Sequence, residues 1–224
     1  QATARGLHVH VHTVNRPRWV IGTTSGQQPR VYIQDDEFKY DARLYVDGDF
    51  YNHQQAIEYA KILGVPQLNC LAGKAPSDVD HQILHDTFVN NLQFAATELK
   101  KANLKLLIEP INTFDIPGFF LSNTKQALQI LDEVGAENAF VQYDIYHAQR
   151  MEGEICNTIE QNLSKIAHIQ LADNPGRNEP GTGEINYAHL FPFLDRIGYK
   201  GWIGCEYKPA TTTEAGLGWI KALN

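Results

Sequence analysis

The chain has 224 residues, of which 43% are hydrophobic and 20% charged, and its formal net charge is −7. This length and composition can bury one sizeable core, so we treat residues 1–224 as a single domain. The acidic balance, without a basic cluster interleaved with aromatic residues, argues against a nucleic-acid partner. We find no apolar run long enough to span a bilayer and no signal-peptide pattern, so we expect no membrane partner.

The first 52 residues differ in character from the rest of the chain. Polar and apolar residues alternate with a period of two over 7–12, 30–34 and 43–47. This alternation predicts short, half-exposed strands, and prolines and glycines interrupt them. We therefore expect residues 1–52 to form an atypical, β-rich segment.

From residue 53 onward, helical and strand patterns alternate. We expect helices over 51–63, 80–101, 123–134, 155–164, 187–197 and 213–223, and strands over 65–71, 104–108, 139–145, 166–172 and 201–207. Short connections between such elements indicate right-handed βαβ units and a parallel sheet. The phosphate-binding glycine signatures of doubly wound sheets are absent. The pattern therefore favours a (βα)8 TIM barrel with an irregular or incomplete N-terminal part.

The three cysteines are widely spaced and odd in number. Cys70 and Cys205 lie in apolar, strand-like runs. We expect buried, reduced thiols in a cytoplasmic protein, rather than a disulfide or a metal site.

Polar residues stand near the ends of the predicted strands, where a barrel gathers its functional groups. They are Asn69, Glu109, Asp144, His168, Gln170 and Glu206. Three carboxylates at close range would raise one another's pKa values unless a cation neutralised them. Oxygen ligands suit Mg²⁺ or Mn²⁺, whereas Zn²⁺ prefers imidazole and thiolate. The strand ends therefore predict a divalent-metal site.

Such a site suits proton transfer next to a carbonyl group through an enediolate. Glu109 and Glu206 end different strands, so the two bases could flank one small substrate. His147 could hold a substrate hydroxyl, or it could make only a local hydrogen bond. Asn69 is a further candidate contact for the substrate.

A glycine-rich loop follows the fourth predicted strand at the same end of the barrel. It runs over residues 174–184 and contains Arg177. An arginine there could clamp a substrate carboxylate with two hydrogen bonds, or it could be an ordinary exposed loop residue. Lys208, just past Glu206, is a weaker candidate cation.

Four segments carry a resemblance to a known family, and they read LLIEPIN, QYDIYHAQ, AHIQLADNPGRNEPGTGEINY and GYKGWIGCEYKP. They closely resemble the hydroxypyruvate isomerases, a family of xylose-isomerase-like TIM barrels that includes the 2-oxo-tetronate isomerases. The resemblance runs from about residue 54 to the C-terminus. It implies interconversion of hydroxypyruvate and 2-hydroxy-3-oxopropanoate, a small hydroxy-oxo acid. It also implies that Glu109 and Glu206 are the proton donor and acceptor, and that the metal ligands are Glu109, Asp144, Gln170 and Glu206.

Residues 1–52 do not match the family pattern, in which this region supplies three βα units. Three alternatives therefore stay open: a 2-oxo-tetronate isomerase, a related sugar epimerase on the same barrel, and a non-catalytic, truncated homologue. The sequence leaves homo-oligomerisation open.

Overall fold

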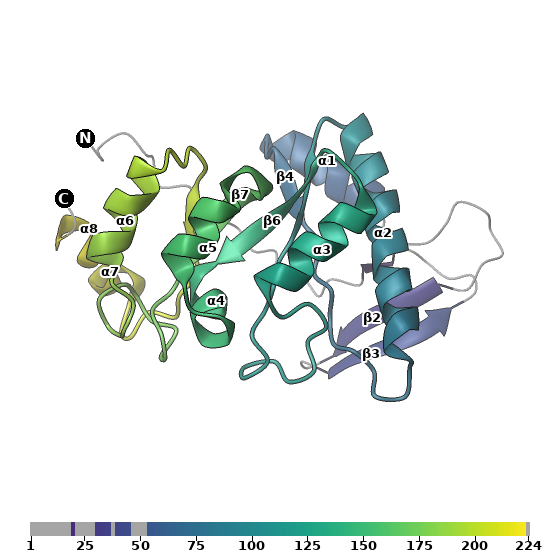
Figure 1. Ribbon diagram of the computed structural model, residues 1–224, viewed down its shortest axis with the longest axis horizontal. Coiled ribbons are helices and arrows are strands. Elements are labelled where there is room, and N and C mark those ends of the chain that lie inside the picture. Colours follow the sequence, from purple (N-terminus) through teal and green to yellow (C-terminus); the bar gives the residue numbers. More distant parts are fainter. Residues whose placement is uncertain (1–18, 21–29, 37–38, 46–52, 223–224) are drawn as a thin grey trace. The chain divides into compact units, whose positions relative to one another are not determined.

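The computed structural model describes residues 19–20, 30–36, 39–45 and 53–222 (Figure 1). The chain divides into two compact units, one of them Thr13–Val141 and the other formed by Gln1–His12 with Gln142–Asn224. The strand expected over 7–12 lies outside the described residues. None of the helices in the described ranges combines the length and the apolar character needed to cross a membrane.

The unit Thr13–Val141 contains a small antiparallel sheet. Its strands are β1 (Trp19–Val20), β2 (Arg30–Asp36) and β3 (Lys39–Tyr45), in the order β1-β2-β3. Residues 30–34 fall on β2 as expected, and residues 43–45 are the end of β3, which begins four residues earlier than predicted. Because these neighbours are antiparallel, they are not βα units.

The same unit contains regular βα elements. In chain order they are α1 (His53–Leu63), β4 (Gln67–Asn69), α2 (His81–Lys101), β5 (Lys105–Ile108), α3 (Thr124–Val134) and the first half of β6 (Ala139–Asp144). Both β4 with β5 and β5 with β6 pair in parallel. The helix α2 packs on β5 and α3 (Figure 1). The core of this unit includes the buried residues Leu92, Leu106, Leu107, Ile108, Leu121 and Ile130.

Side chains at the helix ends explain these boundaries. The carboxylate of Asp80 accepts a hydrogen bond from the backbone N–H of Gln82, and Asn123 does the same for Gln126. Each cap satisfies a backbone donor that the first helical turn leaves without a partner. Gly135 ends α3 with φ of 66°, a left-handed conformation that glycine adopts without steric cost. The predicted limits of α2 and α3 are confirmed.

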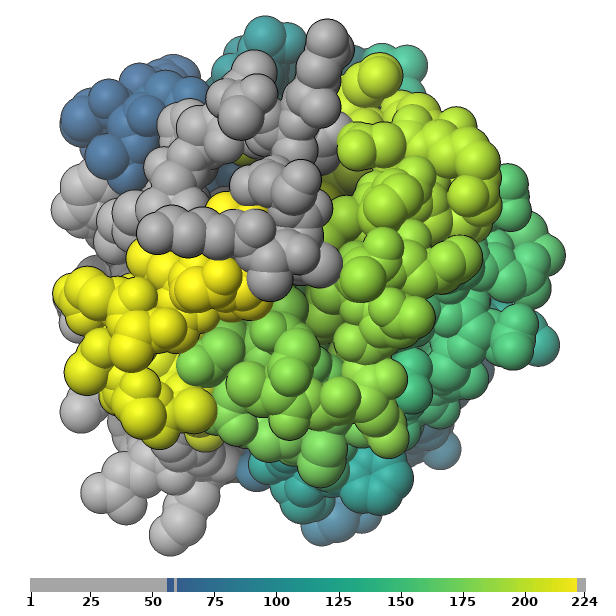
Figure 2. Space-filling model, turned by 90° about the vertical axis from the view of Figure 1, so that its left-hand side faces the viewer, coloured from purple at the N-terminus to yellow at the C-terminus, as the bar shows by residue number. Residues whose placement is uncertain are grey.

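The unit that includes Gln142–Asn224 continues the parallel arrangement. After the second half of β6 come α4 (Ile145–Met151), α5 (Ile155–Gln161), β7 (Ile166–Leu171), α6 (Tyr187–Arg196), β8 (Ile203–Cys205), α7 (Thr213–Gly216) and α8 (Trp219–Ala222). The parallel strands follow the order β4-β5-β6-β7-β8. This unit has its own buried residues: Tyr143, Ile145, Tyr146, Ile159, Ile169 and Leu171. Figure 2 shows its C-terminal residues, in yellow, next to green residues of the same unit.

Three details of this unit differ from the sequence-based expectation. The short helix α4 was not predicted, because it begins at Ile145, directly after β6, and the strand predicted over 139–145 includes that residue. The expected helix over 213–223 is divided into α7 and α8, and Gly216 and Gly218 lie at the division. Cys205 is exposed, whereas Cys70 is buried as expected. Cys205 ends β8, which is an edge strand of the sheet in the described part of the chain.

Candidate active site

The ends of β4 and β5 bring Asn69 and Glu109 together. The side-chain amide of Asn69 donates a hydrogen bond of 2.6 Å to Oε2 of Glu109, which is 4% exposed. The N–H of Cys70 donates to the carbonyl of Leu107, so the two strands stay paired past Asn69. Pro110 follows Glu109 and cannot donate to the ladder. The pair therefore places a buried carboxylate directly after the last residue of a strand.

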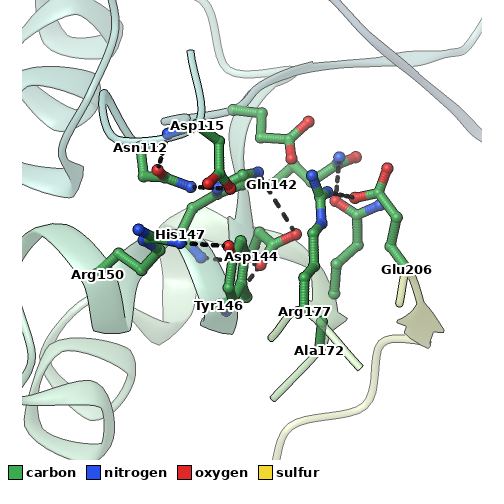
Figure 3. A network of polar contacts seen from close by, with 12 residues as sticks. Asn112, Asp115, Gln142, Asp144, Tyr146, His147, Arg150, Ala172, Arg177 and Glu206 are labelled. Carbon is green, nitrogen blue, oxygen red and sulfur yellow. Dashed lines mark hydrogen bonds and ion pairs between the residues drawn. The ribbon is translucent and has the colours of Figure 1, made fainter. Parts of the chain in front are cut away.

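Asn112 is a buried polar residue that the sequence did not single out. Its Oδ1 accepts a hydrogen bond of 2.8 Å from the N–H of Asp115, and its Nδ2 donates to Asp115 Oδ2 at 3.0 Å (Figure 3). Both bonds close a tight turn just beyond β5. The only signal for this turn in the sequence is an asparagine that follows a strand and stands three residues before an aspartate.

Asp144 ends β6 and also caps α4. Its Oδ1 accepts hydrogen bonds from the N–H groups of Tyr146 at 2.8 Å and His147 at 3.1 Å. Its Oδ2 is buried and has no hydrogen-bond partner in the described part of the chain, and Nε2 of His147 lies 4.0 Å from it. Burial raises the pKa of this carboxyl group, and nearby His147 opposes the rise.

A hydrogen bond between two side-chain amides joins β6 and β7. Nε2 of Gln142 donates to Oε1 of Gln170 at 2.5 Å, and both side chains are buried. His168, on the same strand as Gln170, is 1% exposed. Gln142 was not predicted as a site residue, although it stands two residues before Asp144 in the segment QYDIYHAQ.

Arg177 and Glu206 form an ion pair, with 3.1 Å between a guanidinium nitrogen and Oε2 of the carboxylate. The guanidinium carbon of Arg177 lies 5.3 Å from the ring centre of Tyr146, and that of Arg150 lies 5.5 Å from it. Arg150 also donates a hydrogen bond of 2.7 Å to the Tyr146 hydroxyl. Figure 3 shows Arg150 and Arg177 on either side of Tyr146. The ring thus supports the arginine that faces Glu206.

The glycine-rich loop that carries Arg177 is joined to the segment after β8. The N–H of Lys208 donates to the carbonyl of Arg177 at 2.7 Å, and the Asn178 side chain donates to the carbonyl of Lys208 at 2.7 Å. Lys208 takes part through its backbone, and its side chain is exposed. Its role as a substrate-binding cation stays a prediction.

The carboxylate oxygens of Asp144 are suitable ligands for a divalent cation. A buried carboxylate oxygen without a hydrogen-bond partner is costly, and a hard cation is the partner that oxygen ligands suit best. The side chains of Gln170 and Glu206 also carry oxygen atoms of the kind that bind hard cations. One oxygen of Asp144 therefore caps helix α4, and the other fits a cation as its partner.

Comparisons with known proteins agree with this fold. Residues 51–223 match the family model described as "Xylose isomerase-like TIM barrel". A hydroxypyruvate isomerase from Escherichia coli K12 is 58% identical over 165 residues, covering 74% of this chain and 64% of that protein. A 2-oxo-tetronate isomerase from Cupriavidus necator is 45% identical, covering 75% of this chain and 64% of that protein. The chain thus spans about 64% of the length of these curated relatives.

Solved structures give the same architecture. A crystal structure named "AP endonuclease, family 2", from Brucella melitensis, is 36% identical with a TM-score of 0.73, and the match covers 76% of this chain and 66% of that one. A 3-keto-D-glucoside 4-epimerase from Escherichia coli has a TM-score of 0.65 at 18% identity, covering 76% of this chain and 69% of that one. At that identity the likeness concerns the fold alone.

Proposed function

The chain belongs to the xylose isomerase-like TIM-barrel family, and on that premise we propose that it interconverts hydroxypyruvate and 2-hydroxy-3-oxopropanoate. The observation that carries the proposal is the Arg177–Glu206 ion pair, with 3.1 Å between the charged atoms. It holds a guanidinium, which can bind a carboxylate, directly beside a candidate base. A substrate that carries its own carboxylate next to the reacting carbons suits this pairing better than a neutral sugar does.

We infer that Glu109, Asp144, Gln170 and Glu206 hold a divalent cation, Mg²⁺ or Mn²⁺. Parallel strands direct their carboxyl ends to one edge of a sheet, and these residues end β5, β6, β7 and β8 or lie close to those ends. The Oδ2 atom of Asp144 supports this ligand set, because among the described residues it has no hydrogen-bond partner. The cation would polarise the carbonyl and hydroxyl oxygens of the substrate.

Two carboxylates then move the proton between carbons. Glu109 and Glu206 are the proposed pair: one removes a proton from C3 of hydroxypyruvate, and the other delivers a proton to C2. The hydroxyl proton passes from the oxygen on C3 to the oxygen on C2, so the product is the isomeric aldehyde. Asn69 donates a hydrogen bond to Glu109, which holds its carboxylate in place.

The remaining predicted residues would bind the substrate. Arg177 would hold the carboxylate with two hydrogen bonds, and His147 would bind a hydroxyl group. We keep Lys208 as a weaker candidate for the same carboxylate. A cytoplasmic location remains a prediction from the composition.

The test is an isomerase assay with hydroxypyruvate in the presence of Mn²⁺ or Mg²⁺. We expect activity in the original chain, and a loss of about 10²–10⁴-fold in Glu109→Gln and in Glu206→Gln, because general acid–base groups contribute factors of that size. Glu133→Gln is the matched control, since this carboxylate pairs with His85 and its side chain is 51% exposed. Activity retained in both site variants would contradict the proposal.

A second candidate is the isomerisation of 2-oxo-tetronates, which the 45% identity with a 2-oxo-tetronate isomerase favours. Both substrates carry a carboxylate next to the reacting carbons, so Arg177 suits either. The ratio of kcat/KM for hydroxypyruvate and for a 2-oxo-tetronate separates the two candidates.

A further inference from the structure

We propose that Asp173 is a positioning residue that holds Arg177 where the substrate carboxylate binds. The inference rests on the proposed function for the role of Arg177, and on the structure for the contacts of Asp173. Asp173 lies two residues past Leu171, the last residue of β7, and is 1% exposed. It lies four residues before Arg177, at the start of the glycine-rich loop 174–184.

The carboxylate of Asp173 accepts four hydrogen bonds, all from backbone N–H groups of the loop and the residue after it. Oδ1 accepts from Asn174 at 2.9 Å and from Ile185 at 3.0 Å. Oδ2 accepts from Gly181 at 2.8 Å and from Gly183 at 2.9 Å. One carboxylate therefore joins both ends of the loop, and it does so with charge-assisted bonds, which are stronger than bonds between neutral groups.

Two glycines of the loop permit this arrangement, one through the space that it leaves and the other through its backbone conformation. A Cβ atom at Gly183 would lie 2.0 Å from the carbonyl oxygen of Asn174 and 2.7 Å from Oδ1 of Asp173. Gly181 has φ of 90°, a conformation that residues with a side chain rarely adopt. The sequence Gly-Thr-Gly thus brings two N–H donors onto a single carboxylate oxygen.

Arg177 itself is held from two sides by the backbone. Its φ is 54°, which is uncommon for a residue other than glycine and persists only when the surroundings hold it. The N–H of Asp173 donates to the carbonyl of Asn178 at 2.8 Å, and the N–H of Lys208 donates to the carbonyl of Arg177 at 2.7 Å. These bonds fix the backbone on which the guanidinium stands between Tyr146 and Glu206.

The far side of the loop is anchored in a similar way. Oε2 of Glu179 accepts a hydrogen bond of 3.0 Å from the N–H of Ala210, in the segment after β8. Glu179 is buried, and Gly216 packs against its carboxylate. The loop is therefore a rigid support for Arg177. Rigidity matters because a displacement of about 1 Å in a binding group can cost 10²-fold in rate.

The test compares Asp173→Asn with the original chain. An amide has only one oxygen, so its NH₂ group must face two of the four N–H donors, whichever way the side chain turns. We expect KM for hydroxypyruvate to rise at least tenfold while kcat stays within threefold. Tenfold corresponds to about 1.4 kcal/mol, less than two lost charge-assisted bonds cost in general.

Glu184→Gln is the matched control, because it makes the same carboxylate-to-amide change in the same loop. Glu184 is exposed and accepts hydrogen bonds from the side chains of Asn174 and Gln149. It contacts none of the four N–H groups that Asp173 holds. We expect its KM to stay within threefold of the original value.

A double-mutant cycle distinguishes positioning from general loss of stability. If Asp173 acts through Arg177, Asp173→Asn raises KM at least tenfold in the original chain but less than threefold in the Arg177→Ala background. Equal factors in both backgrounds would overturn the proposal, as would an unchanged KM in Asp173→Asn alone.

A second readout does not need enzyme activity. Hydrogen exchange at the amides of Gly181 and Gly183 should accelerate at least tenfold in Asp173→Asn, with no change in the helix α3 of the other unit. Unchanged exchange at both glycines would contradict the role of Asp173. If the exchange result holds and the original chain does not isomerise hydroxypyruvate, the proposed function fails and the loop support stands.

Discussion

Replacing Arg177 by alanine should weaken substrate binding far more than it weakens the fold. The ion pair with Glu206 is partly open to solvent, with the two side chains 22% and 28% exposed. Pairs of this kind contribute about 0–1 kcal/mol to stability, and a cation on an aromatic ring adds about 0.5–1 kcal/mol. A chain of this size loses about 2–4 °C in Tm per kcal/mol. We therefore expect Tm to fall by about 1–8 °C.

The expected loss in substrate binding is much larger. A carboxylate held by two charge-assisted hydrogen bonds gains about 1.5–3 kcal/mol from each. Removing both costs about 3–6 kcal/mol, and each 1.4 kcal/mol changes an affinity tenfold. We therefore expect KM for hydroxypyruvate to rise by about 10²–10⁴. The KM of Arg177→Lys should lie between those of the original chain and of Arg177→Ala, since lysine keeps the charge but lacks the planar fork of donors.

The assay measures KM, kcat and Tm for the original chain, both Arg177 variants and Arg196→Ala. Arg196 is a suitable control because its guanidinium carbon lies 5.0 Å from the ring centre of Phe193, so its removal also takes an arginine off an aromatic ring. We expect the control to leave KM unchanged. A KM within threefold of the original value in Arg177→Ala would refute the assignment of Arg177 as the carboxylate-binding residue.

Two further predictions concern Asp144 and the buried cysteine. Mn²⁺ at a hundredfold excess over its Kd should stabilise the original chain by about 2.7 kcal/mol, measured in a thermal melt. The Tm of Asp144→Asn should not change with Mn²⁺, because the amide removes the charged ligand. An equal rise of Tm in both proteins would contradict the metal assignment. Burial raises the pKa of Cys70 to about 12, so at pH 8 only about one thiol in ten thousand is ionised. A thiol reagent followed by mass spectrometry should therefore label half-exposed Cys156 and spare Cys70 in the folded protein, and labelled Cys70 would show that its strand opens.

The sequence predicts the framework because the relevant signals are local. An apolar run that ends in an acid places Glu109 and Asp144 at the ends of buried strands, and Asn123 and Gly135 mark the two ends of α3. Each of these signals involves residues within a few positions of one another. Helix α4 has no comparable signal, since it is short and its cap is the same Asp144 that the strand pattern had already accounted for.

The contacts between distant segments could not be predicted in the same way. The partner of Gln142 is 28 residues away on β7, and Arg177 meets Glu206 across 29 positions of the chain. Asp173 is a partial exception. Its four donors all lie within twelve residues, and the glycines of the loop are visible in the sequence. What the sequence does not show is that the backbone turns back onto this one carboxylate.

Hydrogen-bond satisfaction separates two buried aspartates that look alike in the sequence. Both follow or end a strand, and both are at most 2% exposed. Asp173 receives two N–H donors on each oxygen, so its lone pairs are committed to the backbone and its role is to hold the loop. Asp144 receives both of its donors on Oδ1, and Oδ2 has none among the described residues. A buried oxygen in that state costs stability unless a ligand binds it. The same comparison therefore supports the proposal that Asp144 binds a ligand and that Asp173 holds the loop, although Asp144 ends β6 and Asp173 lies just past the end of β7.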